Sequence, residues 1–277
     1  MNAATRGITT GISTVCAWLV VIALACAQAP AQQKPKTYEP EVGQAGKDVV
    51  WVPTSQALVD KMLDLAKVTP QDFVMDLGSG DGRTVITAAK RGATALGIEY
   101  NLDMVELSKR KAAEAGVSER ARFEKADLYQ TDFSKATVIT MFLLPEINLK
   151  LRPKLLELKP GTRIVSNSFT MEEWEADETA SLTSDDECTS WCTALLWIVP
   201  AQVSGTWQLV DGGNLTLAQD FQKVSGKLGK ASITGKLKGR EITFRAGGAT
   251  YTGWVNGNTI QGTIQGGPGG AFTAVRK

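Results

Sequence analysis

Hydrophobic and polar positions follow two different patterns on either side of Pro200. Before it, short apolar runs alternate with longer stretches in which apolar residues recur at helical spacing. This order predicts a doubly wound, Rossmann-like parallel sheet with helices on both faces and a ligand at the carboxyl ends of its strands. The expected strands are 73–76, 95–99, 121–125, 137–142, 163–168 and 193–199, and the expected helices are 55–67 (with Thr54 as N-cap), 81–91, 102–115 and 146–158.

The region after Pro200 loses the helical period and becomes rich in Gly and Thr. Five-residue segments recur every nine residues, starting at Val224, Ile233, Ile242, Tyr251 and Ile260, and in several of them the apolar residues fall at positions one, three and five. Such a repeat predicts an antiparallel meander of short strands, open or closed into a barrel. We expect residues 201–277 to form a small all-β accessory domain, to which the sequence assigns no chemistry.

The N-terminus has the pattern of an export signal. Arg6 precedes the apolar stretch Val15–Ala25, which is short for a membrane span and is followed by small residues. We predict a signal peptide over residues 1–29, a polar linker over 30–48, and a protein exported to the periplasm or cell envelope. The alternative is an uncleaved membrane anchor with the catalytic domain in the cytoplasm, favoured by the lysines that follow the stretch.

The clearest chemical signal is the loop that follows the first expected strand. Asp76 is followed by glycines at 78, 80 and 82, and glycine allows the backbone to approach a ligand closely. Glu99 ends the next strand, 23 residues after Asp76, where a carboxylate can accept hydrogen bonds from ribose hydroxyls. Asp81 lies inside the loop, where it would repel a pyrophosphate but suits a ligand with an ammonium and a sulfonium. The pattern favours S-adenosylmethionine (SAM) over a dinucleotide, with a loop that binds nothing as the remaining alternative.

The segments WVPTSQALVDKML and DFVMDLGSGDGRTVITAAKRGATALGIEYN, with others up to about residue 200, resemble the seven-β-strand class I methyltransferases. Within that class, residues 49–200 are most similar to the group containing the lysine methyltransferase of the ATP-synthase c-subunit. The glycine motif also resembles that of the non-SET histone lysine methyltransferases. The resemblance implies a SAM site in which Glu99 holds the ribose, Asp127 lies near the adenine amine and Thr54 lies near the active site. It places the rest of the cofactor on Asp76, Gly78, Ser79, Gly80 and Asp81.

The segment after the fourth expected strand indicates the methyl acceptor. It is apolar until Glu146 and lacks the Asn/Asp-Pro-Pro-aromatic signature of enzymes that methylate planar nitrogens, which argues against DNA and glutamine substrates. Thr54 and Glu146 are candidate active-site residues, and the candidates for the channel wall are Trp51, Phe142, Phe169 and Trp174. We expect a SAM-dependent methyltransferase acting on a protein lysine; the alternatives are a small-molecule N- or O-methyltransferase and a non-catalytic envelope scaffold.

Composition limits the other classes of function. The chain of 277 residues has a net charge of +1 and no histidine, which excludes histidine-based triads and gives no reason to expect a nucleic-acid partner. Membrane or envelope association remains an expectation from the N-terminus. Cys188 and Cys192 either close a short loop in an oxidising compartment or remain thiols, and two thiolates without other ligands predict no metal site.

Overall fold

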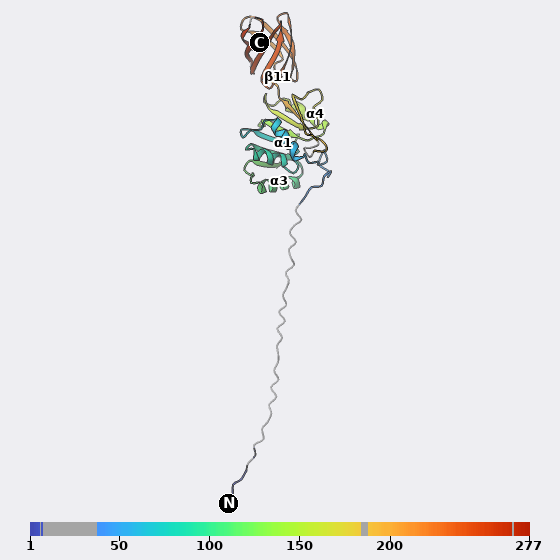
Figure 1. Cartoon of the computed structure of the whole chain (residues 1–277), viewed down its shortest axis with the longest axis vertical. Coiled ribbons are helices and arrows are strands. Elements are labelled where there is room, and N and C mark those ends of the chain that lie inside the picture. Colours follow the sequence, from blue (N-terminus) through green and yellow to red (C-terminus); the bar gives the residue numbers. More distant parts are fainter. Residues whose placement is uncertain (6, 8–37, 184–187, 268) are drawn as a thin grey trace. The chain divides into compact units, whose positions relative to one another are not determined.

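The computed structural model describes residues 1–5, 7, 38–183, 188–267 and 269–277. The chain divides into Met1–Thr37 and Tyr38–Lys277, and the helices and strands that the structure describes lie in the second unit (Figure 1). The predicted signal peptide and the first part of the predicted linker fall almost entirely outside the described residues. Among the described helices, none combines the length and apolar character needed to span a membrane.

The first half of this unit is a seven-stranded sheet with the order β3-β2-β1-β4-β5-β7-β6. The first five strands of this order run parallel. At one edge β7 pairs antiparallel with β5, and β6 pairs antiparallel with β7. The strands are β1 (Phe73–Leu77), β2 (Thr94–Glu99), β3 (Ala121–Lys125), β4 (Val138–Met141), β5 (Arg163–Asn167), β6 (Glu178–Ser181) and β7 (Thr193–Ile198). The predicted fold class is confirmed, although β6 was not among the expected strands.

Helices cover both faces of this sheet. In β1 the side chain of Val74 joins the buried cluster of α1 and α2, whereas Met75 and Leu77 join the cluster beneath α4. This division follows from the alternation of side chains along a strand, which here buries both faces. The helices are α1 (Gln56–Leu65), α2 (Arg83–Lys90), α3 (Leu102–Glu114) and α4 (Pro145–Leu156), each within two residues of its expected ends.

The prediction that Thr54 caps the first helix is wrong by one position. The N-cap of α1 is Ser55, whose hydroxyl accepts a hydrogen bond from the backbone N–H of Leu58. A cap oxygen must reach the second or third N–H of the helix, and Ser55 satisfies that requirement. The Thr54 hydroxyl instead accepts a hydrogen bond from Nδ2 of Asn167 at 3.2 Å.

The second half of the unit is a closed eight-stranded barrel with the order β10-β11-β12-β13-β14-β15-β8-β9. The five repeated segments lie within β10–β14, and pairing of β15 with β8 closes the barrel around an apolar interior. The strands are β8 (Gly205–Leu209), β9 (Asn214–Asp220), β10 (Lys223–Leu228), β11 (Ala231–Lys238), β12 (Glu241–Ala246), β13 (Ala249–Asn256), β14 (Thr259–Gln265) and β15 (Gly270–Arg276).

Residues in the turn between β9 and β10 contact the sheet domain. The ring of Phe221 stacks on Trp174 with centroids 6.0 Å apart, and Nε2 of Gln222 donates to the carbonyl of Glu175 at 2.7 Å. Trp174 is fully buried and also packs against Trp197. The prediction that Trp174 lines the acceptor channel is therefore wrong, because it belongs to the core beside the barrel.

Candidate active site

The order of the strands determines which functional side chains lie next to one another along the carboxyl edge of the sheet. The edge carries Asp127 after β3, Glu99 at the end of β2, Asp76 in β1, Phe142 after β4 and Phe169 after β5. Because β3, β2 and β1 are adjacent and β4 and β5 follow them, the acidic residues occupy one side of the edge and the aromatic residues the other. Neighbouring strands lie about 4.8 Å apart, so these side chains are close together. All five line one cavity of about 590 Å³.

The glycine loop after β1 adopts backbone angles that other residues avoid. The φ angles are +77° at Gly78, +52° at Gly80 and +80° at Gly82. A Cβ on Gly80 would lie 2.6 Å from Nε1 of Trp51, and one on Gly82 would lie 2.7 Å from the ring of Phe123. The loop is closely packed on both sides. Gly80 and Gly82 are therefore required both by the lack of space for a Cβ and by their positive φ angles.

Glu99 is fixed by backbone donors from two neighbouring loops. The N–H of Gly80 donates to Oε2 and that of Asn101 to Oε1, both at 2.9 Å. Each carboxylate oxygen keeps a second lone pair for another donor. This geometry suits a carboxylate that accepts hydrogen bonds from two adjacent hydroxyls.

Asp76 is a buried carboxylate without a cationic partner in the described part of the chain. Burial, together with the negative charges of Glu99 and Asp81, raises the pKa of Asp76 to about 7, although the Thr140 hydroxyl donates to it at 2.7 Å. The hydroxyl of Ser79 in the adjoining loop is also buried and has no hydrogen-bond partner among the described residues. A ligand with an ammonium group and further polar atoms would satisfy both residues.

The carboxylate of Asp81 is already paired with two cationic side chains of the protein. Arg83 and Lys111 bind its carboxylate at 2.9 and 2.7 Å. Burial acts to raise the pKa of Asp81, but these two partners hold it below its ordinary value. Asp81 lines the cavity with its charge already neutralised, and its predicted contact with the cofactor stays a prediction.

Asp127 also has a cationic partner, which comes from the segment before α1. Nζ of Lys47 lies 2.8 Å from Oδ2 of Asp127 and 5.0 Å from the centroid of the Tyr100 ring. The hydrogen bond from Lys47 lowers the pKa of Asp127. Residues 45–54 line the cavity, whereas the sequence pattern had indicated only a linker up to residue 48.

Aromatic rings form the other side of the cavity, and we call Phe142, Phe169 and Trp191 the acceptor wall. The ring of Phe142 stacks on Phe169 and meets Trp191 edge-on, with centroids 5.9 Å apart in both pairs. Asn148 in α4 fixes the loop of Phe169 by donating to its carbonyl at 3.2 Å. Sequence reasoning missed Trp191 as a site residue.

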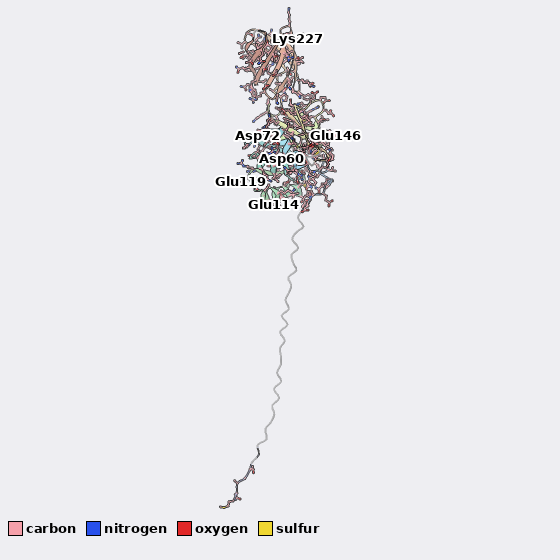
Figure 2. All side chains as sticks on the ribbon, in the orientation of Figure 1. Asp60, Asp72, Glu114, Glu119, Glu146 and Lys227 are labelled. Atoms are coloured by element: carbon pink, nitrogen blue, oxygen red, sulfur yellow. A yellow bond between two sulfur atoms is a disulfide. The ribbon has the colours of Figure 1, made fainter. Side chains whose placement is uncertain are left out.

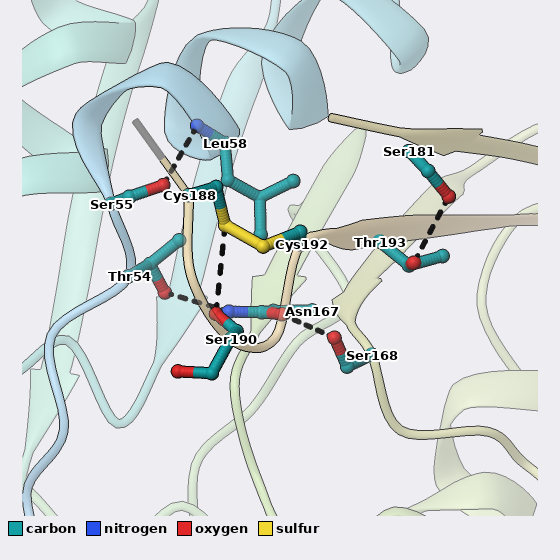
Figure 3. The surroundings of a disulfide bond; sticks show 10 residues. All are labelled: Thr54, Ser55, Leu58, Asn167, Ser168, Ser181, Cys188, Ser190, Cys192 and Thr193. Atoms are coloured by element: carbon teal, nitrogen blue, oxygen red, sulfur yellow. Dashed lines mark hydrogen bonds between the residues drawn. A yellow bond between two sulfur atoms is a disulfide. The ribbon is translucent and has the colours of Figure 1, made fainter. Parts of the chain in front are cut away.

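Two other candidates lie in different places from those expected. Trp51 lines the cavity, but its indole packs on the glycine loop at Gly80 rather than on the acceptor wall. Glu146, labelled in Figure 2, is exposed in the first turn of α4 and is not among the lining residues. The structure therefore gives Glu146 no catalytic position. Thr54 lines the cavity beside its partner Asn167, and Figure 3 shows this pair near the disulfide between Cys188 and Cys192.

Comparison with known proteins identifies the family. A family model described as the ANTKMT methyltransferase domain matches residues 76–178. A protein-lysine N-methyltransferase from Saccharolobus islandicus is 45% identical over 133 residues, which are 47% of this chain and 83% of that protein. The chain belongs to the family of this protein-lysine N-methyltransferase.

Other relatives of the methyltransferase differ in the substrates that their names give. The ATP-synthase c-subunit lysine N-methyltransferase of Mus musculus is 35% identical over 130 residues, 47% of this chain and 52% of that protein. The chain thus spans about half the length of the mouse protein. A crystal structure of an RNA methyltransferase from Salinibacter ruber, in complex with S-adenosyl-L-homocysteine, is 44% identical with a TM-score of 0.51. The match covers 55% of this chain and 96% of the Salinibacter chain.

SAM is the cofactor of this methyltransferase, and the site fits it. Asp76, which has no cationic partner among the described residues, supplies an acidic pocket. Glu99 supplies a carboxylate that can bind hydroxyl groups, and the glycine loop supplies a backbone surface. The expected assignment of the cofactor is confirmed at the level of its identity, whereas the individual contacts stay predictions.

Proposed function

We propose that the protein transfers a methyl group from SAM to the ε-amine of a lysine in a protein substrate. The observation that carries the proposal is the division of the cavity into two sides. Its carboxylates come from β1–β3 and the segment before α1, whereas the segments after β4 and β5 and before β7 contribute apolar and aromatic side chains. Two of the relatives named above are lysine methyltransferases, which supports the same substrate class.

Bound SAM supplies a methyl group already activated by a sulfonium. The acceptor wall then has two tasks, to align a nucleophile and to exclude water. Burial beside Phe142 and Phe169 disfavours a charged ammonium, so a lysine amine would lose its proton on entry. The Thr54–Asn167 pair is neutral and polar, and provides a hydrogen-bonding group beside that position. A strong base is unnecessary for an amine, whereas a hydroxyl or amide acceptor would need one.

RNA is the competing acceptor, because the Salinibacter relative is named as an RNA methyltransferase. The rim of the cavity includes the exposed apolar side chains of Val50, Leu144 and Trp191, and the net charge of the chain is only +1. Nucleic-acid binding surfaces are usually strongly basic, so these features favour a protein or small-molecule acceptor.

The test is the chemical identity of the methylated product. Purified protein is incubated with SAM labelled in its methyl group and an extract of source cells that lack the gene. Acid hydrolysis of the labelled macromolecules is expected to release methyl-lysine, at a rate that rises with pH through the neutral range. Label recovered only in nucleotides, or only in small metabolites, would replace the lysine assignment with the corresponding alternative.

We also propose that the protein is exported, as the N-terminal sequence pattern suggests. The disulfide between Cys188 and Cys192 supports an oxidising compartment. Cell fractionation and N-terminal sequencing of the mature protein test this proposal. A chain that keeps residues 1–29 and lies on the cytoplasmic side would favour the membrane-anchor alternative and a ready supply of SAM.

A further inference from the structure

A covalent ring lies directly before β7, at the carboxyl edge of the sheet. The disulfide joins Cys188 and Cys192, whose Cα atoms are 5.8 Å apart (Figure 3). Cys188 is 8% exposed, whereas Trp191 inside the ring is 45% exposed. The ring is therefore attached to the protein at its cysteine side and presents a large apolar side chain toward the solvent.

The backbone at Trp191 has a conformation that needs support. Its φ angle is +54°, in the left-handed region that non-glycine residues rarely adopt. Such a conformation persists when the surroundings impose it, and it is more common at functional sites. Here the disulfide restrains one side, and β pairing restrains the other, since the N–H of Leu182 donates to the carbonyl of Cys192 at 2.8 Å.

Trp191 completes a group of three rings from three neighbouring strand ends. Its ring meets Phe142 at an angle of 60°, and Phe142 in turn stacks on Phe169. All three line the cavity that contains the SAM site. Phe142 and Phe169 are half-buried, so Trp191 is the most exposed of the three and lies at the solvent-exposed rim of the cavity.

We propose that Trp191 is an acceptor-binding residue and that Cys188 and Cys192 are positioning residues that hold it over the channel. The proposal rests on methyl transfer at the site described above, but not on lysine being the acceptor. At the exposed rim of the cavity, the face of Trp191 binds the aliphatic stem of an amine by apolar contact and its still-charged ammonium by cation–π attraction, before burial deeper in the cavity removes the proton. Without the disulfide the ring loses its covalent restraint, and the wall loses its outermost member.

Three protein forms test the proposal: wild type, Trp191→Ala, and the double variant Cys188→Ser with Cys192→Ser. Total incorporation of labelled methyl from SAM is measured over a dilution series of the extract from cells lacking the gene. At limiting extract, both variants are expected to be slower by roughly 5- to 30-fold. At saturating extract the rates should approach that of the wild type, and the affinity for SAM measured by calorimetry should be unchanged.

Matched controls separate this role from a general loss of structure. Trp254 on the barrel is 56% exposed, and Trp254→Ala should leave transfer unchanged. Trp191→Phe, which keeps an aromatic ring, should recover part of the lost rate. A phosphine reductant supplies the two electrons that, with two protons from water, convert the disulfide to two thiols. It should slow the wild type to the level of the double cysteine variant and leave that variant unaffected.

Several results would overturn the inference. Equal rates for Trp191→Ala and wild type at limiting extract would show that Trp191 does not bind the acceptor. Full activity of the double cysteine variant would show that the disulfide does not position Trp191. Weaker SAM binding in either variant would assign the effect to the cofactor pocket. Total incorporation reports on Trp191 whatever the acceptor, whereas methyl-lysine analysis reports on the proposed function, so the two failures are distinguishable.

Discussion

Asp76 shows how one residue can favour function over stability. A buried carboxylate normally has a cationic partner, because an unpaired charge in the interior is costly. Asp81 follows that rule through Arg83 and Lys111, whereas Asp76 has only neutral hydrogen-bond donors in the described part of the chain. The missing charge is what the ammonium group of SAM would supply.

We expect SAM binding to release a proton from Asp76 in mildly acid solution. Its pKa is raised to about 7, so the carboxyl is largely protonated at pH 6 and must ionise to pair with an ammonium. Affinity should therefore increase between pH 5.5 and 7, by at most about tenfold per pH unit. Calorimetry in buffers with different ionisation enthalpies would detect up to about one proton released per SAM bound at pH 6.

The control variant Asp76→Asn should bind SAM about 10- to 100-fold more weakly, with no pH dependence in this range. Because the raised pKa means that the ligand-free fold loses stability as pH rises from about 4 to 7, the variant should be more stable than wild type at pH 8, by roughly 1–3 kcal/mol. A pH-dependent affinity in Asp76→Asn, or a less stable variant, would contradict this assignment.

Sequence reasoning identified residues beside a strand end or in the glycine loop more readily than residues whose role depends on distant contacts. Asp76 and Glu99 were identifiable because each occurs at a fixed place relative to a strand end and a glycine loop. Lys47 and Trp191 were missed, since their importance depends on contacts with residues far away in sequence. The disulfide could be stated only as one of two alternatives, because a spacing of four residues permits a bond without requiring one.

At the scale of elements, the glycine loop and the segment over residues 45–54 form one packed unit. The indole of Trp51 occupies the space that a side chain on Gly80 would need. The loop can therefore keep its conformation only while position 80 lacks a Cβ. Position 116 also has a positive φ, of +69°, but a Cβ there would meet nothing within 4 Å.

Gly80→Ala and Gly116→Ala are consequently a matched pair. Each substitution should cost about 1–2 kcal/mol of stability through backbone strain alone. Gly80→Ala should in addition displace Trp51 or the loop and weaken SAM binding by more than about tenfold, whereas Gly116→Ala should bind SAM like the wild type. Thermal unfolding and calorimetry measure both effects, and equal SAM affinities in the two variants would show that the loop tolerates a side chain at position 80.

Element boundaries were predictable where the apolar period was strong. Each of the five parallel strands and four helices buries at least one face, and burial of a face gives a regular spacing of apolar residues along the sequence. Strand β6 was missed because it is a short edge strand in which no residue is fully buried. The cap of α1 was misplaced by one residue because Thr54 and Ser55 are both N-cap residue types, and the contact with Leu58 identifies Ser55 as the cap.

On the scale of the whole molecule, the nine-residue repeat predicted strands but could not predict closure. The closing pairs join Leu209 to Ala274 and Trp207 to Arg276, outside the repeated segments. Glycines permit the close approach of strands, since a Cβ on Gly262 would lie 2.0 Å from the carbonyl oxygen of Thr252. The contact of the barrel with Trp174 also depends on residues far apart in sequence, which is why that side chain was assigned to the wrong place.

The arrangement of the cavity and the barrel predicts that cofactor binding and stability can be separated by truncation. Every lining residue lies between Ala45 and Trp191, so a chain truncated to residues 38–200 should bind SAM within about threefold of the full chain. Its melting temperature should be lower, because removal of the barrel exposes Trp174 and breaks the hydrogen bond from Gln222 to Glu175.

Phe221→Ala in the full chain is the matched control for this truncation. It removes only the ring that stacks on Trp174, so it should lower the melting temperature by part of the same amount and leave SAM affinity unchanged. Calorimetry and thermal unfolding on the three proteins distinguish the outcomes. A truncated chain that is folded but does not bind SAM would show that the barrel shapes the cofactor site. A truncated chain as stable as the full one would show that the contact with Trp174 contributes nothing to the fold.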